Sequence, residues 1–153
     1  MIGLMLASNL SARLRRLESC VCLLGEISGQ LEYLRPTVQS LVTSLAAQER
    51  FAQLEFLRQC ARNMRGGHPF SVSWPKALDE CVHQLGREEA VILASLGDVL
   101  GRSDLESQLS ALALTREQFE QRVGAAREKV ITQGKLYRSM GILGGAAAAI
   151  ILI

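Results

Sequence analysis

The chain has 153 residues and a net charge of +2, and 48% of its residues are hydrophobic while only 5% are aromatic. This length fits a single domain, and a composition rich in leucine and alanine but poor in aromatic residues favours packed helices over sheets. Acidic and basic residues are interspersed, and no stacking aromatic residues accompany the basic ones, which argues against a nucleic-acid-binding protein.

The first twelve residues carry no charge, and a group of arginines follows them directly. We interpret residues 1–12 as a membrane-directed segment, because basic residues tend to flank such segments on the cytoplasmic side. Its predicted membrane-interface residues are Arg13, Arg15 and Arg16. A secretory signal peptide is one alternative, although its basic region would precede the apolar stretch. A plain surface helix is the other.

Apolar residues next recur at the heptad spacing of a packed helix. This stripe consists of Leu10, Leu14, Leu17, Val21, Leu24 and Leu31, with Ser28 at the remaining position. Pro36 ends the first helix, because the residue before a proline is pushed out of the α region. The next helix starts at Pro36 or Thr37, and its apolar face consists of Val38, Leu41, Val42 and Leu45.

Another helix is predicted from about Glu49 to Met64, with Phe51, Leu54, Leu57 and Ala61 on its apolar face. Glycine and proline then indicate a loop from Arg65 to Pro69. After this loop, Ser73 is placed to cap a helix that carries Pro75 in its first turn. We expect Trp74, at the entry to that helix, to anchor the core.

Two shorter helices are predicted from Lys76 to Leu85 and from Arg87 to Leu100, separated near Gly86. Gly101 follows the second of them in the position of a helix C-cap. Ser103 and Glu106 then have the spacing of a capping box, which predicts the start of a long helix. Its apolar stripe runs from Leu105 into the C-terminal tail and consists of Leu105, Leu109, Leu112, Phe119, Val123, Ala126, Val130, Tyr137 and Met140, with Arg116 and Gln133 at intervening positions.

The last fifteen residues, 139–153, are uncharged and show no polar face. As a helix they cover only about two-thirds of a ~30 Å hydrocarbon core, which is short for a full span but long enough to anchor the chain. A buried core helix is the alternative. The residues predicted at this second membrane interface are Lys135, Tyr137 and Arg138.

The expected architecture is therefore an all-α bundle of about six helices with apolar, membrane-directed N- and C-terminal segments. Residues 13–138 form its cytoplasmic helical domain. If both ends enter the same bilayer from the same side, the first and last helices must run antiparallel.

Residue spacing predicts neither catalysis nor metal binding. The four cysteines, Cys20, Cys22, Cys60 and Cys81, lack metal-site or redox-motif spacing, so we expect them to be reduced and structural. His68 and His83 have no carboxylate, cysteine or second histidine at ligand spacing. Since no nucleophile and base can be paired either, we expect a protein that is not an enzyme and needs no cofactor or small-molecule substrate.

Several local motifs are similar to those of one protein family. The stronger ones are Leu100-Gly101-Arg102-Ser103-Asp104 with Gln108, and Leu136-Tyr137-Arg138-Ser139-Met140-Gly141 before the apolar tail; the weaker ones are Arg13-Leu14-Arg15-Arg16, Glu32-Tyr33 and Pro36. Together they resemble the stage III sporulation protein AB family of endospore-forming bacteria. The resemblance extends from Gly3 to Ile153.

This resemblance implies a membrane anchor at both ends of a helical cytoplasmic domain similar to the platform protein of type II secretion systems. Such a protein belongs to the channel complex between mother cell and forespore, in the mother-cell membrane that faces the forespore. The implied partners are a secretion-type ATPase, stage III sporulation protein AA, together with other stage III sporulation channel proteins and membrane lipid. A membrane-tethered regulatory or signalling protein unrelated to secretion is the alternative.

The resemblance carries over no catalytic residues. Gly101, Asp104 and Gln108 are candidates for partner contact, although helix capping and local hydrogen bonding could also explain them. The family's first apolar segment normally begins well before Gly3, so residues 1–12 are read as a truncated membrane segment. Either the start codon has been placed too far downstream or the anchor is genuinely shortened.

Overall fold

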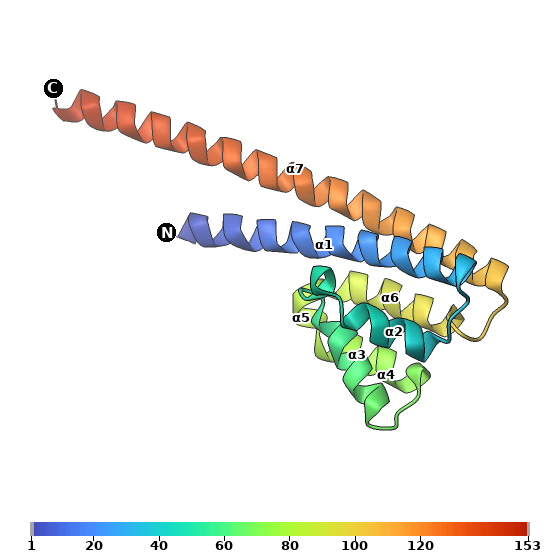
Figure 1. The fold of residues 1–153 in the computed structure, drawn as a ribbon. Helices are drawn as coiled ribbons and strands as arrows, with labels where there is room; N and C mark the ends of the chain where they lie inside the picture. Colours follow the sequence, from blue (N-terminus) through green and yellow to red (C-terminus); the bar gives the residue numbers. More distant parts are fainter. Residues whose placement is uncertain (1, 153) are drawn as a thin grey trace.

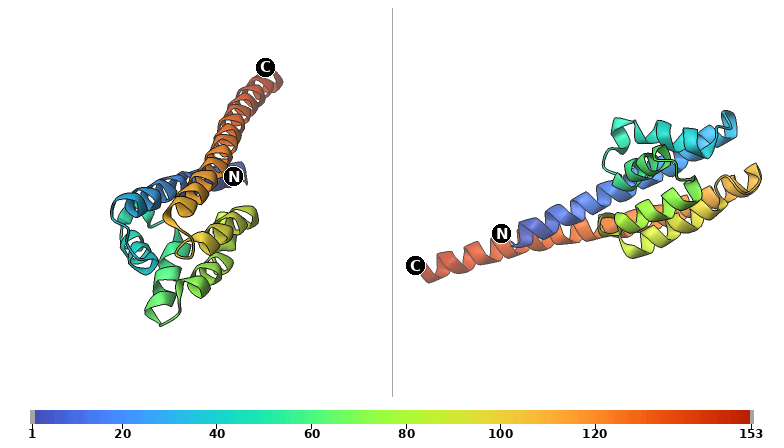
Figure 2. Two further views of the ribbon diagram at one scale, coloured as in Figure 1. Left: turned by 90° about the vertical axis from the view of Figure 1, so that its right-hand side faces the viewer. Right: turned by 90° about the horizontal axis from the view of Figure 1, so that it is seen from below.

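The computed structural model describes the backbone of residues 2–152 and the side chains of residues 9–132, and all regular structure in that range is helical. Two long helices, α1 (Ile2–Tyr33) and α7 (Leu105–Leu152), run antiparallel and lie side by side (Figures 1 and 2). The helices between them in sequence form a small body that packs against both long helices (Figures 1 and 2). The all-α fold and the antiparallel pair are therefore confirmed.

Helix α1 contacts both α7 and the small body. It packs against α7 and also against α2 (Val38–Ala46), η1 (Glu49–Phe51) and α5 (Val82–Leu85) of the small body. Its predicted stripe residues Leu17, Leu24 and Leu31 are buried, and so are Cys20, Leu23 and Ile27, which lie outside the stripe. Because it contacts both α7 and the small body, α1 buries a wider face than a single heptad seam.

Helix α2 (Val38–Ala46) follows the prediction closely. The Thr37 side chain accepts a hydrogen bond from the Ser40 backbone N–H at 3.1 Å, so Thr37 is the N-cap. The predicted Glu49–Met64 helix is wrong as one element, because it divides into η1 (Glu49–Phe51) and α3 (Glu55–Arg65). Its apolar face, Phe51, Leu54, Leu57 and Ala61, is nevertheless buried.

Helix α4 (Phe70–Glu80) begins three residues before the predicted cap. Ser73 is not the N-cap, because Pro69 already directs the chain into the helix with its φ of −69°. The Ser73 side chain is buried, and its hydroxyl donates to the His68 carbonyl at 3.3 Å. Trp74 is the expected core anchor, since its indole N–H donates to the Leu93 carbonyl at 2.7 Å.

The predicted Lys76–Leu85 helix also divides, because Cys81 interrupts it between α4 and α5 (Val82–Leu85). Helix α6 (Arg87–Val99) follows Gly86, as expected. Gly101 ends this region with a φ of +81°, a conformation that favours glycine. The break near Gly86 is thus confirmed. The predicted C-cap position of Gly101 is wrong, because Leu100 is the C-cap of α6 and Gly101 lies in the turn that follows it.

At the start of α7, the predicted capping box is wrong. Asp104 caps the helix instead, and its carboxylate accepts hydrogen bonds from the Ser107 backbone N–H at 3.3 Å and from the Ser107 hydroxyl at 2.6 Å. Ser103 cannot form the predicted capping box with Glu106, because the box needs the Ser103 backbone N–H as a donor. That N–H instead donates to the Val99 carbonyl in the turn that follows α6. The apolar stripe is confirmed in its described part, where Leu112, Phe119, Val123 and Ala126 are buried.

Within the part of the chain that the structure describes, no helix is both long and apolar enough to cross a membrane. The backbone of α7 continues into the apolar tail as one helix, as the stripe predicted. The predicted membrane segments, 1–12 and 139–153, fall mainly on positions outside the described side chains.

Candidate functional site

An open groove of about 560 Å³ lies at the end of the molecule where α1 ends and α7 begins. It is formed where five segments meet: the end of α1, the loop into α2, the start of α4, the end of α6 and the start of α7. Its lining residues are Leu31, Arg35, Pro36, Thr37, Val38, Phe70, Ser71, Leu100, Gly101, Arg102, Leu105 and Gln108. We call these residues the distal groove, because both chain ends lie at the opposite end of the long helices (Figure 1).

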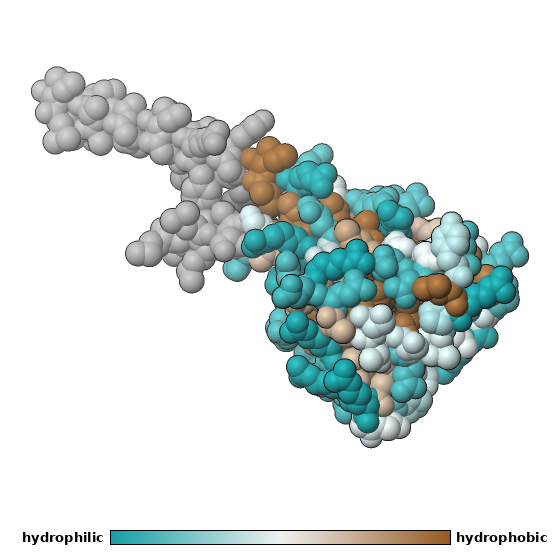
Figure 3. All heavy atoms as spheres, viewed as in Figure 1, coloured by the Kyte–Doolittle hydropathy of each residue, from teal (hydrophilic) through white to brown (hydrophobic). Residues whose placement is uncertain are grey.

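The floor of the distal groove is apolar. Leu31 and Leu100 are buried beneath it, while Val38, Phe70 and Leu105 are partly buried and pack against the core. Two further apolar side chains, Tyr33 and Leu34, immediately precede its residue Arg35 and are strongly exposed. Figure 3 shows the surrounding surface as mostly hydrophilic, with a hydrophobic group at this end of the molecule.

Two arginines give the distal groove a positive rim. Arg35 follows α1 and Arg102 follows α6, and both are exposed. Neither forms an ion pair with any of the described residues 9–132. Both guanidinium groups are therefore available to an external anion.

Arg35 also has a strained backbone. Its φ of +47° is in the left-handed region, which no other non-glycine residue of the described chain adopts. This conformation turns the chain out of α1, where the N–H groups of Leu34 and Arg35 both donate to the Gln30 carbonyl. A side chain in this region costs roughly 1–2 kcal/mol relative to the right-handed region, so the position favours glycine although arginine occupies it.

The three residues predicted to contact a partner have local structural roles at this end. The Gln108 side chain accepts from the Gly101 N–H at 3.2 Å and donates to the Ser103 carbonyl at 2.7 Å. A Cβ on Gly101 would lie 2.8 Å from Cγ2 of Val38. Gly101 and Gln108 line the distal groove, whereas Asp104 lies beside it and caps α7.

The predicted membrane-interface residues are placed in different environments. Arg13 forms an ion pair and Arg15 is exposed. Arg16 is partly buried, and its buried Nε has no hydrogen-bond partner among the described residues. Lys135, Tyr137 and Arg138 lie outside the described side chains.

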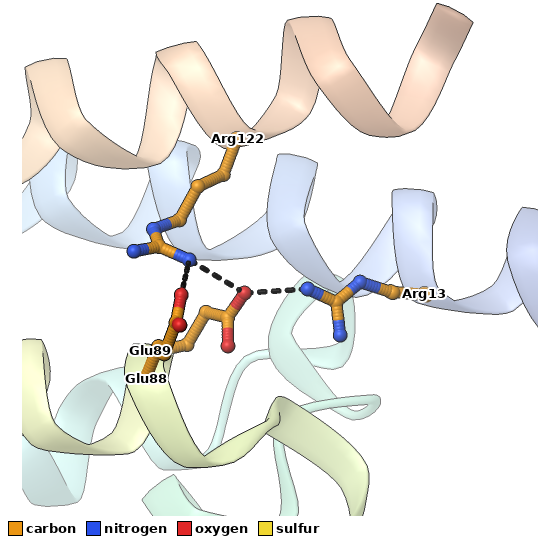
Figure 4. A network of polar contacts seen from close by, with 4 residues as sticks. All are labelled: Arg13, Glu88, Glu89 and Arg122. Carbon is orange, nitrogen blue, oxygen red and sulfur yellow. Dashed lines mark hydrogen bonds and ion pairs between the residues drawn. The ribbon is translucent and has the colours of Figure 1, made fainter. Parts of the chain in front are cut away.

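A buried carboxylate joins three helices near the middle of α1 and α7 (Figure 4). Glu89 of α6 is 2% exposed, and its Oε1 lies 2.6 Å from Arg13 of α1 and 3.2 Å from Arg122 of α7. Arg122 also contacts the exposed Glu88 at 3.0 Å. We call Arg13, Glu88, Glu89 and Arg122 the Glu89 network.

The Glu89 network was not predicted, although the sequence of α6 contains a signal for it. Glu89 precedes Leu93, Leu96 and Leu100 by four, seven and eleven residues, so it lies on the buried stripe of α6. A charged residue on such a stripe needs a buried partner, and basic residues were available on both long helices.

The remaining reactive side chains are dispersed. All four cysteines are free, with Cys22 exposed and the other three buried. Burial raises the pKa of both Cys20 and Cys60 to about 12, and Glu89 acts in the same direction on Cys20. No group of three potential metal ligands is found among the described residues, and His68 and His83 lie on separate segments.

Two comparisons with known proteins agree with each other. The sequence model of the stage III sporulation protein AB family matches residues 1–153. A solved structure described as stage III sporulation protein AB has a similar fold, with a TM-score of 0.61 and 17% sequence identity, over 78% of this chain and 97% of that one. At that identity the structural similarity concerns the fold alone. No curated protein sequence matches the chain.

Proposed function

The chain belongs to the stage III sporulation protein AB family, and we propose that it is a membrane-anchored scaffold of the channel complex between mother cell and forespore. Family membership places its role in sporulation. The finer proposal is that its helical domain couples a secretion-type ATPase, stage III sporulation protein AA, to the membrane components of the channel. Its location is the mother-cell membrane that faces the forespore.

The observation that carries this proposal is the placement of the two chain ends relative to the distal groove. Helices α1 and α7 bring both apolar ends to one end of the molecule, while the distal groove lies at the other (Figure 1). If residues 1–12 and 139–153 anchor in one bilayer, the domain of residues 13–138 stands on the cytoplasmic side. Its distal groove then points away from the membrane, where a soluble ATPase can reach it.

The anchoring part of the proposal can be tested by washing membranes from sporulating cells. Carbonate and high salt release proteins that are held by basic patches alone, because salt screens exposed charges. We expect the chain to remain in the pellet, held by its uncharged C-terminal segment. Release of the chain by carbonate would contradict an embedded anchor.

The proposed partners can be tested by a pull-down with the detergent-solubilised chain as bait and the purified ATPase and channel subunits as prey. We expect the ATPase and at least one membrane subunit to be retained. As a matched control, an unrelated helical membrane protein of similar size is immobilised at equal density. Failure to retain any of these proteins above that control would contradict the scaffold role.

A further inference from the structure

We propose that the distal groove binds a partner protein through a segment that combines large apolar side chains with carboxylates. The identity of that partner as a channel or ATPase component rests on the proposed function, whereas the chemistry of the segment rests on the groove alone. The occupant is therefore defined by what it must present: apolar groups to the floor and negative charge to the rim.

The apolar floor of the distal groove indicates that the bound segment carries apolar side chains. Val38, Phe70 and Leu105 are only partly buried although each packs against the core, so each retains apolar surface that another group can cover. Covering apolar surface is favourable, because it removes that surface from water. Leucine or aromatic side chains inserted from a partner would remove this surface from water.

The two arginines at the rim of the distal groove indicate that the bound segment carries negative charge. Arg35 and Arg102 come from different turns, and neither has an anionic partner among the described residues. Arginine presents a planar fork of donors that matches a carboxylate, and such charge-assisted bonds are stronger than neutral ones. Two unpaired arginines beside an apolar floor thus complement an acidic and apolar segment, and they disfavour a basic one.

The backbone of Arg35 supports this assignment. A glycine would adopt its φ of +47° without the cost that arginine bears. Such strain is found where the side chain has a use that outweighs it. The rim cation supplies that use, because glycine at this position would leave Arg102 as the only arginine lining the distal groove.

The shape of the distal groove favours a protein segment over a small molecule. Small-molecule sites enclose most of the ligand surface, whereas this groove is open along the ends of several helices. Amphipathic helices and extended peptides bind to such open apolar grooves through a few anchoring side chains.

The test measures binding of a fluorescein-labelled amphipathic peptide of about 14 residues, with leucines at helical spacing between glutamates. The full chain is reconstituted in lipid nanodiscs, so that no free detergent occupies the groove, and binding is followed by fluorescence anisotropy. We expect saturable binding, weakened at least about tenfold by the double substitution R35E/R102E. Replacing the peptide's leucines by alanine, or its glutamates by lysine, should abolish binding.

The matched control is R58E/R65E, which makes the same charge change on α3. Arg58 and Arg65 are exposed and form no ion pair among the described residues, and they lie outside the distal groove. This control should bind the peptide within about twofold of the unaltered chain, because its substituted side chains lie outside the distal groove. Since both variants change the net charge equally, a difference between them cannot arise from net charge alone. Circular dichroism verifies that both variants are folded.

Three outcomes would overturn the proposal. The first is absence of saturable binding, and the second is equal weakening by R35E/R102E and R58E/R65E. The third is displacement of the peptide by inorganic phosphate at low ionic strength to the same extent as by unlabelled peptide, which would indicate a simple anion pocket. Peptide binding by a chain that retains neither the ATPase nor any channel subunit would contradict the scaffold role and leave the distal-groove proposal standing. Conversely, retention of these proteins without saturable peptide binding would contradict the distal-groove proposal and leave the scaffold role standing.

Discussion

At the scale of single residues, Trp74 shows how tightly the small body is packed. Its ring contacts those of Phe56 and Phe70 at centroid distances of 5.5 and 5.4 Å, and its N–H donates to the Leu93 carbonyl. On the side facing α6 it lies directly against Gly97, where an added Cβ would overlap the indole Cδ1 and lie 2.7 Å from its Nε1. The small body thus depends on the absence of a side chain at Gly97.

We therefore expect Gly97→Ala to destabilise the protein by about 1–3 kcal/mol. In an open helix the same change stabilises by about 0.5–1 kcal/mol, because alanine loses less conformational freedom than glycine. Here the indole cannot move without losing its hydrogen bond to Leu93. Thermal unfolding followed by circular dichroism measures the effect, at roughly 2–4 °C per kcal/mol for a chain of this size.

Gly124 provides the control for this substitution. It lies in α7, and no atom of the described residues comes within 4 Å of a Cβ placed there. Gly124→Ala should accordingly raise the midpoint of unfolding slightly. If both alanine variants were stabilised, the contact between Gly97 and Trp74 would have no energetic role.

The cysteines give a second prediction at this scale. A chromogenic disulfide reagent at pH 8 should react rapidly with one thiol of the four, the exposed Cys22, and with all four after denaturation. The reason is that the thiolate is the reactive form and burial disfavours it. Rapid reaction of a second thiol in the folded protein would show that the packing around one of the buried cysteines opens locally.

Alkaline stability follows from the same burial. Burial raises the pKa of Cys20 from 9.0 to about 12. The contribution of the neutral Cys20 thiol to the free energy of unfolding is therefore fully present below pH 9 and is lost as the pH rises toward 12. We expect a loss of about 1 kcal/mol from this thiol at pH 10. Comparing the fall in stability from pH 8 to pH 10 between the unaltered chain and Cys20→Ala isolates it, and equal falls would contradict the prediction.

At the scale of secondary-structure elements, Asp104 fixes where α7 begins. The Ser107 hydroxyl and then the Ser107 backbone N–H hold the pKa of the Asp104 carboxyl below its ordinary value of 3.8. A lowered pKa means that the stabilising effect is present above pH 3.8 and is lost as the pH falls through the folded-state value. The cap is therefore fully effective at neutral pH.

We expect Asp104→Ala to lower the midpoint of thermal unfolding at pH 7 but to have progressively less effect below pH 3.8. Asp104→Asn is the matched variant, because its side-chain oxygen can still accept from Ser107 while the charge is lost. It should retain more stability than the alanine variant. An alanine effect that stayed constant down to pH 2 would show that the charge of the cap is unimportant.

The elements also show how far the sequence pattern reaches. A stripe such as the one from Leu105 to Ala126 correctly indicated a long helix, because helical periodicity depends on burial along one face. The same periodicity concealed the break after η1, since Phe51, Leu54 and Leu57 keep helical spacing across a turn that is not helical. Periodicity detects a buried face, and it cannot detect a change of backbone conformation that leaves the same residues buried.

Helix starts were harder to predict for a different reason. Ser73 and Ser103 are both good capping residues by type, yet Pro69 and Asp104 precede the two helices instead. Which polar residue caps a helix depends on where the preceding turn ends. That turn is set by the packing of the element before it, as the bond from the Ser103 N–H to Val99 shows.

At the scale of the whole molecule, the distal groove could be predicted only in part. The motif around Gly101 and Gln108 indicated the right region, and both residues line the groove. Arg35 could not be associated with Arg102 from the sequence, because they are distant in the chain and meet only when α1 and α6 end at the same level. The groove is a product of tertiary packing, and no local pattern encodes it.

The Glu89 network connects the small body to both long helices, so it is the place to test whether the molecule unfolds as one unit. Its members differ in exposure: Glu89 is 2% exposed, whereas the side chains of Arg13 and Arg122 are 42% and 30% exposed. Glu89→Gln leaves two arginines that can still reach water. We expect it to destabilise the protein by about 1–3 kcal/mol.

Removing the two cations should cost more than removing the anion. R13Q/R122Q leaves the Glu89 carboxylate buried without a charged partner among the described residues, and breaking a buried pair in this way costs about 3–5 kcal/mol. Denaturant unfolding of the unaltered chain, Glu89→Gln and R13Q/R122Q provides the comparison. In each case hydrogen exchange should rise together in α1, α6 and α7, because these helices share the network. A larger cost for Glu89→Gln, or a rise confined to α6, would show that the carboxylate does not couple the small body to the long helices.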